Sequence, residues 1–114
     1  MTQLQARRTE AANACLEVLD TDFFSALCEP ARVQLVRALV LYGEADIQTL
    51  ASRFTQDRSV ISRHLRVLEK AGIVLSTKAG RQQIFQLNGP EIVERMEAML
   101  RLMKTLVPIC CPGR

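Results

Sequence analysis

The stretch from Asp57 to Gly72, DRSVISRHLRVLEKAG, restricts the possible folds of this chain more than any other segment. At 3.6 residues per turn, Ile61, Leu65 and Leu68 fall on one face of a helix. The opposite face carries hydroxyls and cations but no carboxylate: Ser59, Ser62, Arg63, Arg66 and Lys70. Asp57 suits the N-cap and Gly72 suits the stop. The pattern predicts a short amphipathic helix whose polar face fits either a phosphate-lined groove or plain solvent.

The distribution of charge favours the groove. The net charge is only +3, yet residues 53–81 hold seven Lys or Arg against two acids, whereas residues 1–46 hold four Arg against seven acids. Positive charge concentrated around one amphipathic helix is the pattern expected of a nucleic-acid-binding face. The sequence therefore predicts that this helix contacts nucleic acid.

The segments beside this helix complete a recognisable supersecondary unit. Asp46 can cap a helix from Ile47 to Phe54, and residues 55–57 then leave a tight turn before the basic helix. Apolar residues alternate after Gly72, and the sequence Lys78-Ala79-Gly80-Arg81 suits a hairpin tip. We therefore predict a mainly α fold with a small β-hairpin (α+β), a winged helix-turn-helix with the helix-turn-helix at about 47–71 and the wing at about 73–87.

Helices are also expected on both sides of this unit. Apolar positions predict a helix at about 9–19, and Pro30 suits the first turn of a helix to Tyr42 with Val33, Val36 and Val40 packed inward. Residues 90–107 carry a heptad-like seam of Ile92, Met96, Met99, Met103 and Leu106. Pro108 is expected to end that helix, leaving a cysteine tail at 108–114. With 114 residues, the chain is predicted to be a single domain, 1–114.

Other classes of protein are disfavoured by what the sequence lacks. It shows no secretory signal and no apolar run of membrane-spanning length, so a cytoplasmic location without a membrane partner is expected, with its four cysteines as thiols. No enzyme is predicted, because His64 is the only histidine and no glycine-rich phosphate loop is present. A protein-interaction module using the methionines of the last helix is an alternative, although such a stripe more often forms core or dimer interface.

Three segments resemble the ArsR/SmtB family of bacterial metal-sensing repressors. FSALCEPARVQLVRAL is similar to the family's ALA-(D/H)-P-T-R segment and following helix, SVISRHLRVLEKAGIV to its recognition helix, and GRQQIFQL to its wing. The resemblance is close over about residues 23–87 and rests on position alone in the flanking helices. It implies a homodimer, formed through the first and last helices, that binds a double-stranded operator with an inverted repeat and leaves it when an inducer binds.

The same resemblance assigns DNA contacts. It places Arg58, Ser59, Ser62, Arg63 and His64 toward the major groove, with Lys78 and Arg81 on the wing. The helical wheel agrees for both serines and for Arg63. Arg66 and Lys70 are expected to contact phosphate, which positions a protein on DNA without specifying sequence. His64 lies about 60° from the apolar centre of the helix. It is therefore as well suited to packing at the boundary of the core as to contacting DNA.

The inducer sites known in relatives have no counterpart here. Where many family members have ELCVCDL, this chain has EADIQTL, with Asp46 and Gln48 at the cysteine positions. A zinc site of His and carboxylates on the last helix also fails, because Glu91, Glu94 and Glu97 have no histidine among them. The remaining soft ligands are thiols.

Cys110 and Cys111 supply two adjacent sulfurs, which suit trivalent arsenic or antimony, or else Cd(II) or Cu(I). A pyramidal three-sulfur centre needs one more thiolate, and we assign it to Cys15 because the family implies that the first and last helices meet. Cys28 is expected in the core, although it stays an alternative third ligand, and the site could lie within one chain or between two. We predict a repressor induced by an arsenite-type or antimonite-type metalloid, with no organic cofactor. The rivals are a disulfide or persulfide switch, and a terminal cysteine pair with no function.

Overall fold

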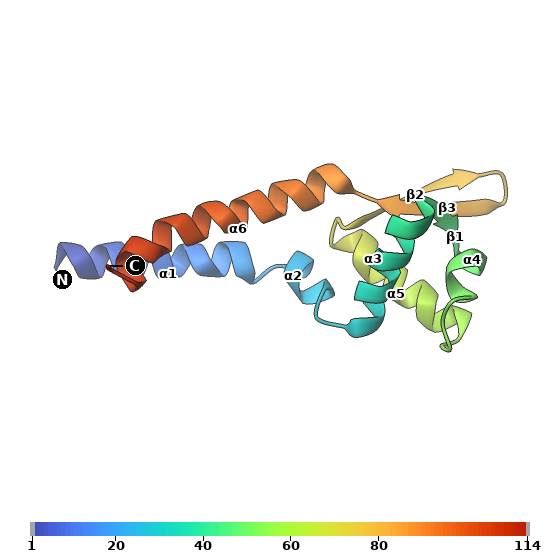
Figure 1. Ribbon diagram of the computed structural model, residues 1–114, viewed down its shortest axis with the longest axis horizontal. Coiled ribbons are helices and arrows are strands. Elements are labelled where there is room, and N and C mark those ends of the chain that lie inside the picture. Colours follow the sequence, from blue (N-terminus) through green and yellow to red (C-terminus); the bar gives the residue numbers. More distant parts are fainter. Residues whose placement is uncertain (1, 114) are drawn as a thin grey trace. The chain divides into compact units, whose positions relative to one another are not determined.

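The computed structural model describes residues 2–113, and its described part is mainly helical with a small antiparallel sheet (Figure 1). This confirms the expected fold class. In chain order the elements are α1 (Gln3–Leu19), α2 (Asp22–Ala26), α3 (Pro30–Tyr42), β1 (Glu44–Asp46), α4 (Ile47–Ala51), α5 (Arg58–Lys70), β2 (Val74–Ala79), β3 (Gln82–Leu87) and α6 (Gly89–Cys110).

These elements form two compact units. The first, which we call the helical unit, comprises the chain up to Thr21 and from Val93 onward, and so contains α1 and most of α6. The second, the winged unit, comprises Asp22–Ile92 and holds the remaining elements, including all three strands. No helix among the described residues is long and apolar enough to cross a membrane.

The core of the winged unit is built around α5. Ile61, Leu65 and Leu68 are each fully buried, as the helical wheel predicts, and they pack in one cluster with Leu35 and Leu39 of α3. Burying an aliphatic side chain of this size contributes about 1.5–3 kcal/mol. This cluster holds the apolar face of α5 inward and therefore leaves its cationic face outward.

The helix-turn-helix has the expected order, with a longer turn than predicted. Asp46 caps α4, accepting a hydrogen bond at Oδ1 from the backbone N–H of Thr49 at 2.8 Å. Helix α4 ends at Ala51 rather than Phe54, so residues 52–57 separate it from α5. Asp57 occupies the N-cap position of α5 with extended backbone, but its side chain makes no capping hydrogen bond.

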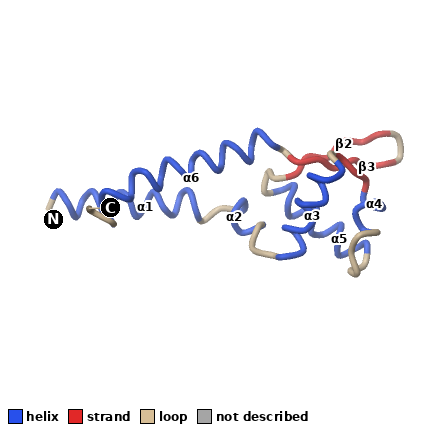
Figure 2. The backbone as a smooth tube through the Cα atoms, in the orientation of Figure 1, coloured by secondary structure: helices blue, strands red, loops and turns tan. Residues whose placement is uncertain are grey.

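The wing is a three-stranded antiparallel sheet in the order β1-β3-β2. Figure 2 shows its strands in red. Strands β2 and β3 form the predicted hairpin, and their last pair is Ala79 with Gln82, so Gly80 and Arg81 make the tip. Gly80 adopts a φ of 67°, a left-handed conformation that glycine reaches without strain. Strand β1 pairs Ala45 with Phe85 and was not predicted, because three residues are too few to show an alternating pattern.

Helix α3 packs largely through a different face from the one predicted, and of the three valines only Val36 lies against the core, half-buried. Val33 and Val40 are exposed, at 45% and 67%, whereas Leu35 and Leu39 are buried. The prediction followed the valines, but alanines and leucines at Ala31, Leu35, Ala38 and Leu39 form a second helical stripe. The smaller alanines let this second stripe approach α5 and the sheet closely.

Both helices of the helical unit are longer than predicted. Helix α1 begins at Gln3 instead of about residue 9, with Thr2 Oγ1 accepting from the backbone N–H of Gln5 at 3.0 Å. Helix α6 runs through Pro108 to Cys110, so the prediction that Pro108 ends the helix and starts a tail is wrong. Proline has a φ that fits a helix, and its cost there is the loss of its own N–H bond and a clash of its ring with the carbonyl four residues earlier. The next turn forms normally, as the 2.8 Å bond from Cys111 N to Val107 O shows.

Candidate nucleic-acid interface and thiol cavity

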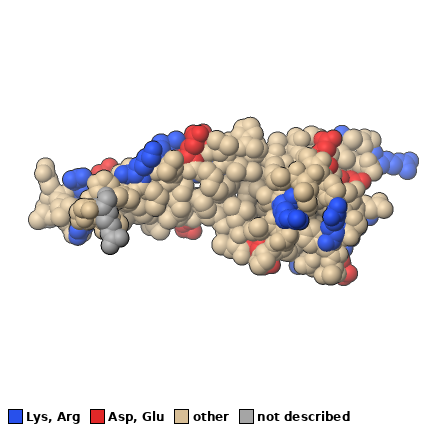
Figure 3. Space-filling view, in the orientation of Figure 1, with Lys and Arg blue, Asp and Glu red and all other residues tan. Residues whose placement is uncertain are grey.

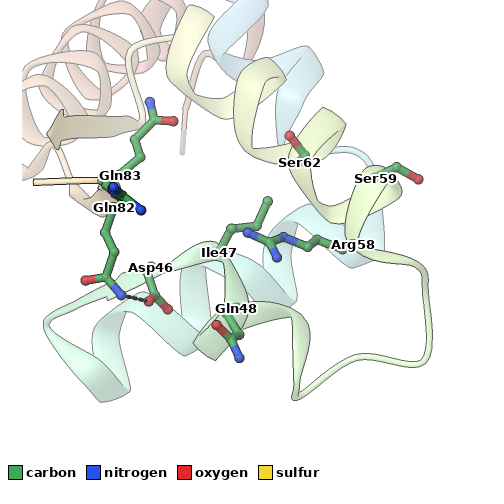
Figure 4. A pocket seen from close by; sticks show the side chains of 9 residues that line it. Asp46, Ile47, Gln48, Arg58, Ser59, Ser62, Gln82 and Gln83 are labelled. Carbon is green, nitrogen blue, oxygen red and sulfur yellow. Dashed lines mark hydrogen bonds between the residues drawn. The ribbon is translucent and has the colours of Figure 1, made fainter.

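A cavity of about 580 Å³ lies between the first turns of α4 and α5 and the tip of the wing; we call it the reading cavity. Four of the eight predicted DNA contacts line it together, namely Arg58, Ser59, Ser62 and Arg81. The other lining residues are Asp46, Ile47, Gln48, Gln82 and Gln83. In Figure 4, the Arg58 side chain extends from the start of α5 toward α4.

The remaining predicted contacts lie outside this cavity. Arg63 and Arg66 are exposed on α5, and Lys78 is exposed on β2. Figure 3 shows Lys and Arg side chains projecting from the end of the β2–β3 hairpin. The winged unit thus carries exposed cations on both α5 and the wing, which are two of the elements that flank the reading cavity.

His64 lies at the boundary of the core, which is one of the two positions that the sequence allows for it. It is half-buried, and its Nδ1 lies 3.4 Å from Nη1 of Arg32, whose Nε donates to the carbonyl of Ala26 at 2.6 Å. Guanidinium groups only donate, so Nδ1 acts as the acceptor in this contact. The side chain therefore faces α3 and the end of α2, and its contact with DNA stays a prediction.

Two side-chain bridges hold the wing against the helices. Gln82 Nε2 donates to Oδ2 of Asp46 at 2.9 Å, the bond drawn in Figure 4. Ser76 Oγ donates to Glu69 of α5 and accepts from Gln83 Nε2 at 2.8 Å. The first bridge joins β3 to the N-cap of α4, and the second joins both hairpin strands to the end of α5. Together they fix the wing beside α5, which we call the reading helix.

Asp46 is a fixed negative charge within this cationic surface. Hydrogen bonds from Thr49, first from its backbone N–H, hold the pKa of the Asp46 carboxyl below its ordinary value of 3.8. The positive charge of Arg58 lowers this pKa further, while partial desolvation opposes the shift. The carboxylate is therefore ionised at neutral pH.

A second cavity, of about 450 Å³, lies between α1 and α6 within the helical unit; we call it the thiol cavity. Cys15 and Cys110 both line it, with a lining otherwise formed by Arg8, Ala11, Ala12, Leu106 and Ile109. Cys15 is half-buried and Cys110 is exposed. The structure thus brings together two of the three cysteines predicted to bind metal.

The other two cysteines lie elsewhere. Cys111 is exposed just beyond α6 and does not line the thiol cavity. Cys28 is exposed as well, so the prediction of a core position is wrong; its Sγ is 3.5 Å from the carbonyl of Phe24. It follows the end of α2, where no neighbouring element covers it. Among the described residues of one chain, no group of three or more His, Cys, Asp or Glu is placed to hold a metal ion.

Sequence reasoning missed the part played by the glutamines of the reading cavity. Gln82 and Gln83 occur in a strand with nothing to distinguish them from other surface residues. In the sequence, Gln48 stands out only because it occupies a position where many family members have a cysteine. The signal that identifies them is spatial, because the pairing of β1 with β3 is what brings the wing to the N-cap of α4.

The reading helix, the preceding short helix and the wing define a winged helix-turn-helix, a class of DNA-binding protein. Residues 29–76 match the family described as "Bacterial regulatory protein, arsR family". The chain belongs to this family and is a DNA-binding transcriptional regulator, not an enzyme.

Solved structures agree with this assignment. The chain is 38% identical to a "possible transcriptional regulator for arsenical resistance", with 70% of this chain and 81% of the other covered and a TM-score of 0.62. It is 28% identical to the ArsR family transcriptional regulator RHA00566, covering 79% and 90% of the two chains with a TM-score of 0.67. It is also 28% identical over 85 residues to the uncharacterized HTH-type transcriptional regulator Rv0081 of Mycobacterium tuberculosis (strain ATCC 25618 / H37Rv), with 75% of each covered.

Proposed function

We propose that this protein is a homodimeric repressor that binds an inverted-repeat operator and releases it when a trivalent metalloid, of the arsenite or antimonite type, binds its cysteine thiolates. The observation that carries the sensing half of this proposal is the thiol cavity, which Cys15 and Cys110 both line. The similarity to a protein described as a possible regulator for arsenical resistance supports the same chemistry.

The DNA half of the proposal rests on the surface around the reading cavity. Ser59, Ser62 and Arg63 would contact base edges, since hydroxyls and guanidinium groups bond to groups in the major groove. Arg66, Lys78 and Arg81 would neutralise phosphates, which position the protein without specifying sequence. Arg58 reaches the cavity from the first turn of α5 and could serve either purpose.

Dimerisation would occur through the helical unit. In a single chain, its two helices leave several large apolar side chains exposed to solvent: Leu4, Leu16 and Leu19 on α1, and Val93, Met96, Leu100 and Val107 on α6. Large apolar side chains left exposed in this number on two helices are typical of a protein–protein interface. A second copy of the chain would cover it and place two reading helices on one duplex.

The metalloid would bind first to the thiolates of Cys15 and Cys110. Soft thiolates suit soft ions, and the residues that line the thiol cavity are mostly apolar, with no carboxylate among them. Cys111 follows Cys110 directly and would supply the third sulfur after a change at the end of α6. As each sulfur–metalloid bond forms, the bond from the metalloid to one of its hydroxide ligands breaks, and that hydroxide takes the proton of the thiol and leaves as water.

Release would follow from the course of α6. This helix starts in the winged unit, where Ile92 packs against the core, and ends at Cys110 in the helical unit. Operator half-sites lie about 34–36 Å apart, so a small rotation at the dimer interface prevents both reading helices from docking together. A difference in affinity of about 5 kcal/mol between the two states would reverse the occupancy of the operator.

The test is operator release followed by fluorescence anisotropy, using a duplex that the protein selects from a random pool. Arsenite and antimonite should release the wild type, whereas Cys15→Ser and Cys110→Ser should still bind the duplex but no longer leave it. Cys28→Ser is the matched control, because this thiol is also exposed but lies in the winged unit. Normal release from all of the serine variants would refute a thiol site for the metalloid.

A thiol-redox switch is the second candidate, and the same pair favours it. Oxidation of Cys15 and Cys110 would join their sulfurs in a disulfide, with two electrons and two protons passing to an oxidant such as a peroxide. A persulfide switch would use the same sulfurs. Release by peroxide or polysulfide but not by arsenite would select this alternative, and release by arsenite under reducing conditions would reject it.

A further inference from the structure

The reading cavity contains three glutamines, and two of them already have partners. Gln82 donates to Asp46 and Gln83 donates to Ser76, so both amides hold the wing in place. Gln48, in the first turn of α4, is exposed and makes no hydrogen bond with its side chain among the described residues. Its amide is therefore available to a ligand that enters the cavity.

We propose that Gln48 is a specificity-determining residue that reads an adenine in the major groove, beside the bases contacted by α5. This inference rests on the proposed function, because it requires that the reading cavity faces operator DNA. A side-chain amide has one donor and one acceptor at the spacing of adenine N6 and N7, and this bidentate pairing discriminates adenine from other bases. Gln48 lines the same cavity as Ser59 and Ser62, so it would read a neighbouring base pair.

A phosphate and a base edge can be compared as partners of Gln48. Arg58 and Arg81 line the same cavity and are the charged groups that suit a phosphate, whereas the side chain of Gln48 is neutral. The ionised carboxylate of Asp46 lies two positions earlier in the chain and lines the same cavity. A phosphate placed there would meet this negative charge, whereas a base edge is neutral. The exposed cations of α5 and the wing already supply phosphate contacts, and a neutral amide adds little to them. The amide of Gln48 therefore suits a hydrogen-bonded contact with a base edge.

The experiment is selection of duplexes from a random pool by purified protein, followed by competition anisotropy with single-base variants. The wild type should select an adenine at one position of each half-site. Gln48→Ala should lose that preference, reducing a discrimination of about 5- to 100-fold to nearly none, with the other positions unchanged. Gln48→Glu should prefer cytosine there, because a carboxylate accepts from the amino group of cytosine.

Gln86→Ala serves as the matched control, because Gln86 is exposed on β3 and does not line the reading cavity. It should select the same sequence as the wild type. Circular dichroism should show all variants folded, since none alters a buried residue.

Two results would overturn the inference while leaving the proposed function intact. The first is an identical selected sequence, with equal discrimination, for wild type and Gln48→Ala. The second is a loss of affinity in Gln48→Ala that is equal for all sequences, which would show a phosphate contact. If the wild type selects no sequence at all, the proposed function fails and this inference fails with it.

Discussion

Replacing Arg66 by alanine tests whether the polar face of α5 lies against a DNA backbone. Arg66 is exposed and lies one helical turn after Ser62, on the side of α5 that carries Arg63. It lies further from the start of α5 than Ser59, Ser62 and Arg63, and the N-terminal residues of a reading helix are the ones that contact base edges, so we assign Arg66 to phosphate. Its removal should weaken binding to all duplexes and should also change how binding responds to salt.

The size of this change follows from counterion release. Each neutralised phosphate contributes about −0.9 to the slope of log K against log salt, and a dimer would lose two such contacts. The slope should therefore become less steep by about 1.8. Between about 50 and 200 mM salt, a fourfold range, the affinity deficit of Arg66→Ala relative to wild type should shrink about 12-fold.

Anisotropy titrations at several salt concentrations, on a selected and an unrelated duplex, measure this slope directly. Arg101→Ala is the control, because it removes the same charge from α6. The Arg101 side chain is 64% exposed and its Nη1 lies 3.9 Å from Oε2 of Glu97, so the salt slope of this variant should equal that of the wild type. An unchanged slope for Arg66→Ala would refute the phosphate contact. A loss confined to the selected duplex would instead indicate a base contact.

Three further changes test the fold around this surface. Leu65→Ala should lower the free energy of unfolding by about 3 kcal/mol in urea, because the side chain is fully buried, whereas Leu75→Ala, 43% exposed, should change it far less. Gly72→Ala should cost about 1–2 kcal/mol, because φ is +81° there and a methyl group would lie 3.3 Å from Cγ of Glu91; an unchanged urea midpoint would contradict this. The ionised form of Asp46 stabilises the fold above pH 3.8, and this effect is lost as pH falls through the lowered pKa. The difference in free energy of unfolding between wild type and Asp46→Asn should therefore become smaller from about pH 6 to about pH 3. An equal difference at the two pH values would contradict the lowered pKa of Asp46.

The reading helix could be predicted from sequence because its two faces differ so sharply. Ile61, Leu65 and Leu68 recur at helical spacing among charged residues, and only one orientation buries all three. Helix α3 gave the wrong face because nearly every position is apolar, so periodicity alone cannot choose between stripes. The choice is made by neighbouring elements, which a single helical wheel does not contain.

The thiol cavity shows the same limit. Sequence reasoning named Cys15 and Cys110 as ligands, but it placed Cys110 on a tail because proline usually ends a helix. The structure continues α6 to Cys110 and brings both thiols to one cavity. Whether a proline near a helix end stops it depends on the hydrogen bonds of the following turn, which form here from Cys111 to Val107. Such bonds depend on packing and leave no mark in the sequence.

The run from Ser62 to Leu65 explains how one short motif can both read DNA and hold the reader in place. Ser62 lines the reading cavity and Arg63 is exposed, while Leu65 is fully buried. His64 lies between these two groups, with Nδ1 against Arg32, and Arg32 in turn bonds the end of α2. Successive helical residues rotate by about 100°, so four residues in a row necessarily reach both faces. Loss of His64 would therefore change DNA affinity through the placement of α5 even where the imidazole contacts no base, so an affinity loss alone does not identify it as a reader.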